Sequence, residues 1–288
     1  MKNRKIRIPL KLVITAVLFP RVEAIWPWLA SRWFVKIFFS TARFKTSTPE
    51  EEAYRSAKKS RLIFENKRIQ TYEWGEGKPV LFVHGWMGRA TQFHKFIKPF
   101  NLAGFKVVSF DSLGHGASEG NQSHLMKFAG IVKQLADQYE GFEMIVGHSL
   151  GGVASLHAIK DFKVSDKLVM VASPAIAQEI VDEFRKKIGA SKNCEDYFQK
   201  YIYAKYGKRF EEYSASYIVS EVTDAQLFLI YDENDREVSI KSSQVMSQKS
   251  PDAKLMITQG LGHNRILRDN EVITSSLAFL QNSEPVLA

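Results

Sequence analysis

Beyond residue 60, short apolar runs alternate with longer stretches of helical periodicity. The runs hold three to five residues, at 80–83, 106–110, 143–146, 168–172, 227–231 and 255–257. Continuous apolar runs of this length are typical of strands buried on both faces of a parallel sheet. Helical patterns follow at 91–101, 122–139, 150–160, 238–248 and 269–281. This order predicts an α/β fold with a mostly parallel central sheet that is flanked by helices.

Two further elements precede this alternation. Residues 62–65 and 69–74 alternate between apolar and polar side chains, which predicts two strands joined as a hairpin. Upstream, Thr48 followed by Pro49 and three glutamates predicts a helix start, with Thr48 as the N-cap and Pro49 as the first helical residue. We therefore expect one domain over residues 46–288.

One interval departs from the rhythm. About fifty residues, 174–224, separate the fourth of these runs from the fifth, and they are helical in pattern. A segment of this length is too long for a loop within a compact domain, so we predict an inserted helical lid. It carries six tyrosines, which we expect for the most part to pack in an ordinary helical layer: Tyr197, Tyr201, Tyr203, Tyr206, Tyr213 and Tyr217.

Composition supports a folded enzyme-sized domain. The 288 residues are 45% hydrophobic and 25% charged, with 9 Pro and 17 Gly, which excludes collagen-like and disordered chains. The single cysteine, Cys194, excludes an intramolecular disulfide and a cysteine-based zinc cluster.

The net charge of +9 lies in one segment. Residues 1–45 contain ten Lys and Arg and one acid, Glu23, so the remaining chain is neutral. A neutral body gives no support to a nucleic-acid-binding surface, and we expect no nucleic-acid partner.

The basic segment 1–45 is also aromatic, with Trp26, Trp28 and Trp33. Its longest apolar run, 12–19, is too short for a bilayer-spanning helix, which needs about 20 residues. We expect a helix that lies in the membrane interface, with aromatic side chains in the bilayer and basic ones at anionic headgroups. Two alternatives stay open: a helical arm packed on the body or on a partner subunit, and a signal peptide cleaved after 22–24. If the segment lies in the membrane interface, we expect the protein to be cytoplasmic and peripheral on the inner face of the membrane.

A candidate nucleophile lies in the G-x-S-x-G motif 147–151. The motif occurs twice, because 116–120 also fits, and context separates the two. Ser149 follows a predicted strand and opens an apolar helix, whereas Ser118 lies in a polar, glycine-rich loop. A strand, a tight turn and a helix are what a nucleophile elbow requires, which favours Ser149. The Leu150 N–H then points into the site from the first turn of a helix, where backbone donors lack intrahelical partners.

An oxyanion formed by serine attack needs at least two donors. The glycine-bounded loop 83–88 follows a predicted strand, and we expect the Trp86 N–H to be the second donor beside Leu150, with the indole lining the site. We expect His84, in the same loop, to brace it by a hydrogen bond rather than to act in catalysis.

The general base must be one of seven histidines. His263 is favoured because it follows the last predicted strand and precedes the last helix, at the edge of the sheet where Ser149 is expected. An acid that orients it should follow the preceding strand. Four carboxylates qualify by charge: Asp232, Glu233, Asp235 and Glu237.

Together these motifs resemble the α/β-hydrolase superfamily, over about residues 61–282. The His-Gly-x-x-Gly loop at 84–88, the loop 111–118, the elbow 147–151 and the Gly-x-Gly-His motif 260–263 occur in the expected order. The resemblance implies the chain order Ser, acid, His and a helical lid between strands six and seven. A family pattern, G-x-x-D-x-x-V, aligns with 232–238 and selects Asp235, although Asp232 stands at the glycine position.

The resemblance implies a serine hydrolase that cleaves an ester of a small molecule with the triad Ser149, Asp235 and His263. It implies no metal and no organic cofactor. The same machinery could act on a thioester, a lactone or a carbon–carbon bond. A non-catalytic binding protein on the same fold is the alternative of a different class.

Overall fold

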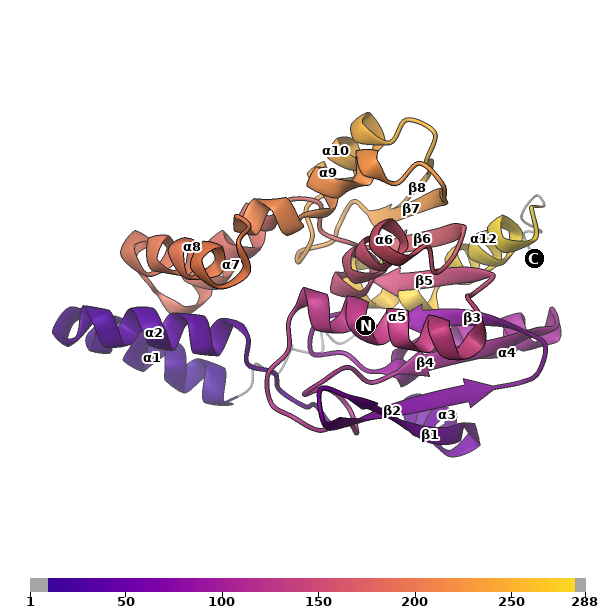
Figure 1. Cartoon of the computed structure of the whole chain (residues 1–288), viewed down its shortest axis with the longest axis horizontal. Coiled ribbons are helices and arrows are strands. Elements are labelled where there is room, and N and C mark those ends of the chain that lie inside the picture. Colours follow the sequence, from indigo (N-terminus) through magenta and orange to yellow (C-terminus); the bar gives the residue numbers. More distant parts are fainter. Residues whose placement is uncertain (1–9, 283–288) are drawn as a thin grey trace.

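The computed structural model describes residues 10–282 and contains an eight-stranded sheet (Figure 1). The strand order is β1-β2-β4-β3-β5-β6-β7-β8, and all pairings from β4 to β8 are parallel. The strands are β1 Lys58–Phe64, β2 Lys67–Trp74, β3 Lys78–Val83, β4 Phe105–Phe110, β5 Met144–His148, β6 Lys167–Val171, β7 Gln226–Asp232 and β8 Lys254–Thr258. The predicted mostly parallel sheet is therefore confirmed.

Helices cover both faces of this sheet (Figure 1). One apolar core joins a face of the sheet to α5 and α6, through residues such as Phe128 and Leu156. The second core joins the opposite face to α4 and α12, through residues such as Phe96 and Ile273. The helices of the body are α3 Thr48–Ser56, α4 His94–Leu102, α5 Leu125–Tyr139, α6 Leu150–Phe162, α10 Lys241–Lys249, α11 Gly262–Arg265 and α12 Asn270–Gln281.

The predicted hairpin is confirmed, since β1 and β2 pair antiparallel around Glu65 and Asn66. Both turn residues have positive φ, 47° and 59°, as a two-residue hairpin turn with matching twist requires. The N-cap of α3 was misplaced by one residue. Ser47 has the extended backbone of an N-cap, and Thr48 is already helical.

The segment between β6 and β7 is helical, as expected. We call it the insert; it contains α7 Ala177–Ile188, α8 Lys192–Tyr206, α9 Ala215–Ile218 and short 3₁₀ turns. The expectation that most of its tyrosines pack inward is wrong. Four of the six are at least 36% exposed, namely Tyr197, Tyr203, Tyr206 and Tyr217.

Before the body lie two helices that we call the arm, α1 Leu10–Ile25 and α2 Pro27–Phe38. They lie beside α7 and α8 (Figure 1). Phe19 and Phe34 of the arm share an apolar cluster with Val181 and Phe198 of the insert, and all four are fully buried. One face of the arm is thus packed on the chain itself. No helix in residues 10–282 is long and apolar enough to cross a membrane, and residues 1–9 lie outside the described part.

Polar contacts also connect arm and insert. The Glu23 carboxylate accepts hydrogen bonds from the Ser191 N–H at 3.0 Å, from the Ser191 hydroxyl, and from the Cys194 thiol at 3.1 Å. Burial raises the pKa of the Cys194 thiol to about 12, and the hydrogen bond to Glu23 adds to that rise. The thiol is therefore neutral at physiological pH and serves as a donor within this contact.

After the arm, residues 39–47 run across the loops that follow β3 and β4. Arg43 donates to the carbonyls of Gly116, Ser118 and Gly120, at 2.6 to 3.0 Å. The Thr41 hydroxyl donates to the Gly114 carbonyl at 2.8 Å. The arm is consequently bound to the body at the edge of the sheet where the parallel strands end.

Candidate active site

Ser149 occupies a sharp turn between β5 and α6. Its φ of 52° and ψ of −123° lie outside the regions that a residue with a Cβ ordinarily adopts, so the backbone is strained there. The Ser149 N–H donates to the Val171 carbonyl at 2.9 Å, which fixes the turn against β6. Within residues 10–282 its hydroxyl has no hydrogen-bond partner. The strand, turn and helix predicted around Ser149 are confirmed.

Close approach of backbone to backbone makes this turn possible. A Cβ added to Gly151 would lie 2.1 Å from the Val83 carbonyl oxygen, so only glycine lets α6 start against β3. The competing motif has no such geometry. Ser118 is 3% exposed, and its hydroxyl accepts from the Gln70 N–H at 2.8 Å and donates to the Asp111 carbonyl. It connects β2 to the loop that follows β4.

Asp235 and His263 meet at the same edge of the sheet. The distance between His263 Nδ1 and Asp235 Oδ2 is 2.8 Å, and their side chains are 9% and 2% exposed. Burial alone would raise the pKa of Asp235, but the hydrogen bond and charge of His263, with the N–H groups of Glu237 and Val238, lower it overall. Asp235 is therefore ionised and holds a proton on His263 Nδ1, which leaves Nε2 as the basic nitrogen.

Asp232 takes a different place. Its carboxylate accepts from the backbone N–H groups of Leu261 and Gly262, both at 2.9 Å, and from the Thr258 hydroxyl at 2.8 Å. It thereby holds the loop that carries His263, without touching the imidazole. Of the two aspartates that the sequence offered, the structure brings Asp235 to His263.

Leu150 follows Ser149 directly, and Trp86 follows Gly85, whose added Cβ would lie 2.9 Å from the Ser149 Cβ. Leu150 is the first residue of α6, and Trp86 lies in the turn closed by the hydrogen bond from the Gly88 N–H to the Gly85 carbonyl at 3.0 Å. Within residues 10–282 neither backbone N–H donates to another group. Both remain available for an oxyanion, and their role stays a prediction.

The other histidines near the site have structural contacts. His84 Nδ1 lies 2.7 Å from the Gly85 carbonyl oxygen, and its Nε2 accepts from the Ser112 N–H at 3.0 Å. The predicted bracing role is thus confirmed. His148 Nε2 lies 2.9 Å from the His263 carbonyl oxygen, so the residue before the nucleophile supports the backbone of the base. Burial lowers the pKa of His84 to about 4 and that of His148 to about 3, and both are neutral at pH 7.

Glu237, another of the candidate acids, lies near His263 but does not contact its Nδ1. Glu237 Oε2 lies 3.9 Å from His263 Nε2, and its side chain is half exposed. It lies near the imidazole nitrogen that Asp235 does not contact. Within residues 10–282 no three His, Cys, Asp or Glu side chains gather as a metal site would require.

Comparison with known proteins agrees with this geometry. A sequence model of the serine aminopeptidase family, S33, matches residues 77–193, which include the elbow. The human "Serine hydrolase-like protein" is 33% identical over 120 residues, 38% of this chain and 58% of that protein. The zebrafish (Danio rerio) "sn-1-specific diacylglycerol lipase ABHD11" is 29% identical over 107 residues, 35% of this chain and 34% of that protein. The chain thus spans less than two thirds of the length of either relative.

Solved structures share most of this fold at low sequence identity. A Pyrococcus furiosus esterase has a TM-score of 0.63 at 18% identity, covering 85% of this chain and 98% of that one. The strand order, the elbow and these likenesses agree on the fold. The chain has the α/β-hydrolase fold.

Two further solved structures are similar to this chain over most of its length. A thioesterase domain from the curacin biosynthetic pathway has a TM-score of 0.59 at 16% identity, covering 78% of this chain and 99% of that one. A membrane phospholipase A, described as a bacterial virulence factor, has a TM-score of 0.61 at 15% identity, covering 94% of this chain and 98% of that one.

Proposed function

We propose that this α/β-hydrolase-fold protein is a serine hydrolase that cleaves a carboxylic ester through an acyl-enzyme intermediate. The observation that carries the proposal is the 2.8 Å contact between Asp235 and His263, on buried side chains at the sheet edge that also carries the strained Ser149 turn. A buried carboxylate that fixes one imidazole nitrogen leaves the other free to accept a proton from a nucleophile.

In the proposed reaction, the Ser149 hydroxyl oxygen forms a bond to the acyl carbon while His263 Nε2 takes the hydroxyl proton. The carbonyl oxygen becomes an oxyanion that the N–H groups of Trp86 and Leu150 stabilise. Collapse of this intermediate breaks the bond to the leaving alcohol, which receives the proton from His263. Water then attacks the acyl-enzyme with the same base, releasing the acid and restoring Ser149.

The ionised Asp235 supports two steps of this reaction. It keeps the Nδ1 proton in place, and its negative charge stabilises the imidazolium that forms when His263 takes the serine proton. The insert connects β6 to β7 in the chain, and we propose that it acts as the lid that selects the acyl group.

The names of the relatives do not identify one leaving group for the reaction. The zebrafish relative is named a diacylglycerol lipase, one structural neighbour is an esterase and another is a thioesterase domain. The same residues could therefore serve a thioester, a lactone or a carbon–carbon bond. A binding protein without catalysis is disfavoured because the Asp235–His263 pair and the open Ser149 hydroxyl would have no use in one.

Labelling with a fluorophosphonate tests the proposal, because this probe reacts with an activated serine and with no passive one. We expect labelling of the full chain and of Ser118→Ala, and none of Ser149→Ala. A Ser149→Ala variant that is labelled would refute the assignment. p-Nitrophenyl esters of increasing acyl length, and the matching thioesters, would then define the substrate.

We further propose that the arm attaches the protein to an anionic membrane surface. The face of α1 and α2 that points away from the insert exposes large apolar side chains, which are 40–64% exposed: Val17, Leu18, Ile25, Trp26, Trp28, Leu29 and Ile14. The exposed Arg21 and Lys36 also lie on the arm, and residues 1–45 carry the whole net charge. An apolar face bordered by cations is complementary to lipid with negative headgroups.

A further inference from the structure

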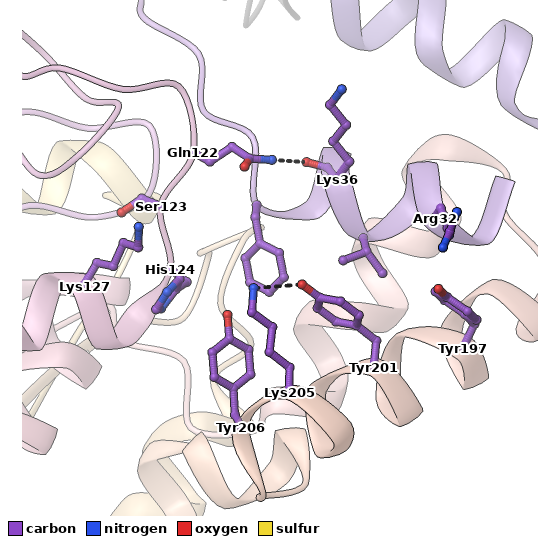
Figure 2. Close-up of a pocket in the computed structure, with 12 residues that line it drawn as sticks. Arg32, Lys36, Gln122, Ser123, His124, Lys127, Tyr197, Tyr201, Lys205 and Tyr206 are labelled. Carbon is purple, nitrogen blue, oxygen red and sulfur yellow. Dashed lines mark hydrogen bonds between the residues drawn. The ribbon is translucent and has the colours of Figure 1, made fainter. Parts of the chain in front are cut away.

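A cavity of about 450 Å³ lies where the arm, the insert and the body meet. Figure 2 shows its walls, which come from α2, from α8 and from the segment that leads into α5. Twelve residues line it: Arg32, Val35, Lys36, Phe39, Gln122, Ser123, His124, Lys127, Tyr197, Tyr201, Lys205 and Tyr206. None of these is Ser149, Asp235 or His263, so this cavity is separate from the candidate active site.

The lining is strongly positive. It contains four cationic side chains and no carboxylate. Lys127 is paired with Glu65, at 2.8 Å. Within the described part of the chain, Arg32, Lys36 and Lys205 have no carboxylate within 4.0 Å, and in Figure 2 the Lys36 chain extends away from the tyrosines. Arg32 and Lys205 thus bring positive charge to the cavity that no carboxylate of residues 10–282 pairs with directly.

Hydroxyl groups complete the set of donors. Lys205 Nζ donates to the Tyr201 hydroxyl at 2.9 Å and lies 5.1 Å from the centroid of the Tyr206 ring, so its ammonium is held in place rather than free in solvent. Tyr197 adds one more hydroxyl, whereas the buried Ser123 hydroxyl lies 3.5 Å from that of Ser112. Tyr197 and Tyr206, which are exposed rather than packed in the helical layer, both line this cavity.

His124 adds a neutral ring to this wall. Burial, and then the positive charge of Lys127, lowers the pKa of His124 to about 4, so it adds no charge at pH 7 and can donate or accept one hydrogen bond.

We propose that this cavity binds the phosphate group of an anionic ligand. A phosphate has several acceptor oxygens and carries up to two negative charges, which matches convergent Arg, Lys and hydroxyl donors better than a single carboxylate does. The volume exceeds that of a phosphate alone and is typical of small-molecule sites, so the tyrosine rings can contact the organic part of a phosphate ester. Such a ligand would bridge arm, insert and body.

Two sources can supply this chemistry, a soluble phosphate ester or the headgroup of a phospholipid at the membrane that the arm would face. Calorimetric titration distinguishes them with three probes: inorganic phosphate, sn-glycerol 3-phosphate, and dihexanoyl phosphatidylglycerol below its critical micelle concentration. Tighter binding of the short-chain lipid indicates a headgroup, and tighter binding of sn-glycerol 3-phosphate indicates a soluble ester.

Matched variants locate the binding. Arg32→Ala and Lys205→Ala should each weaken the best probe by about tenfold, as expected for loss of one charged hydrogen bond. Lys200→Ala on α8 and Lys249→Ala on α10 remove the same charge from exposed positions outside the cavity and should leave binding unchanged. Unchanged unfolding temperatures would show that all four variants fold.

Two outcomes would overturn the proposal. One is that none of the three probes binds the full chain at millimolar concentration. The other is that the control variants weaken binding as much as Arg32→Ala and Lys205→Ala do, because the effect would then be general attraction to a basic protein. Neither outcome bears on the ester hydrolysis proposed for Ser149, which is measured on a neutral soluble ester.

Discussion

Gly85 lies directly against Ser149, such that a Cβ added to Gly85 would lie 2.9 Å from the serine Cβ. The same added atom would lie 3.2 Å from the His148 carbonyl oxygen, so backbone as well as side chain closes this space. The loop that carries Trp86 is therefore in contact with the nucleophile. Any side chain at position 85 must displace either that loop or the serine.

This contact predicts the effect of Gly85→Ala. The added methyl group should separate the Trp86 N–H from the position of the oxyanion, and we expect turnover to fall by about 10²-fold, as for loss of one oxyanion donor. Hydrolysis of a p-nitrophenyl ester measures it, with Gly104→Ala as the control. Gly104, unlike Gly85, has positive φ, but no atom lies within 4 Å of its added Cβ. Equal losses in both variants would contradict the oxyanion interpretation.

The two aspartates after β7 should have separable roles. We expect Asp235→Asn to lower kcat by about 10³–10⁴-fold with little change in stability, because an amide cannot stabilise the imidazolium. Asp232→Asn should chiefly lower stability, since an amide nitrogen cannot accept from the N–H groups of Leu261 and Gly262. Urea unfolding and ester kinetics on both variants test this, and a larger catalytic loss at Asp232 would reverse the assignment.

Local sequence patterns predicted the body well, because the central strands β3 to β7 are largely buried apolar runs and each candidate site motif lies within a few residues of a strand end. Those patterns left Asp232 and Asp235 nearly equivalent, since both are acids after the same strand. Only the positions of Thr258, Leu261 and Gly262 in space show that Asp232 holds the loop while Asp235 meets His263.

The packing of the arm against the insert could not be predicted from local sequence patterns. Phe34 and Phe198 are far apart in the sequence, and nothing in the periodicity of either helix specifies that they meet in one cluster. The exposed tyrosines of α8 were misjudged for the same reason, because the cavity that they line is formed in part by α2.

Buried histidines predict a pH dependence of stability. Burial lowers the pKa of His84 to about 4 and those of His115 and His148 to about 3, against 6.5 for an unfolded chain. Between these values the unfolded state binds more protons, so stability falls as pH drops below about 6.5. Each group should cost about 2 kcal/mol at pH 5, from about 1.4 kcal/mol per pKa unit.

Urea unfolding at pH 7.5, 6 and 5 measures this dependence. The midpoint should be nearly constant above pH 7 and fall steadily below 6.5, with an unchanged slope against urea. His115→Asn should show a shallower dependence than the full chain, because it removes one of the three groups. A midpoint that is equal at pH 7.5 and pH 5 would contradict the prediction.

The membrane proposal requires variants that separate the two faces of the arm. Trp28 is 63% exposed and Ile25 is 64% exposed, whereas Phe34 is fully buried against Phe184 and Phe198. Deleting residues 1–45 would uncover the apolar cluster of the insert and confuse loss of binding with loss of folding. Single substitutions on either face avoid this.

We expect the double variant Ile25→Gln, Trp28→Gln to lose most of its binding to phosphatidylglycerol vesicles while keeping its unfolding temperature and soluble-ester activity. Phe34→Ala should instead lower stability by about 3–5 kcal/mol, as deletion of a buried aromatic ring does.

Co-sedimentation at increasing salt measures the binding, which should weaken because screening reduces the attraction of Arg21 and Lys36 to anionic headgroups. Salt-independent binding to neutral phosphatidylcholine vesicles would show that apolar insertion alone attaches the arm. If the double variant bound as well as the full chain, the outward face of α1 and α2 would not be the membrane-binding surface and the proposal would be wrong.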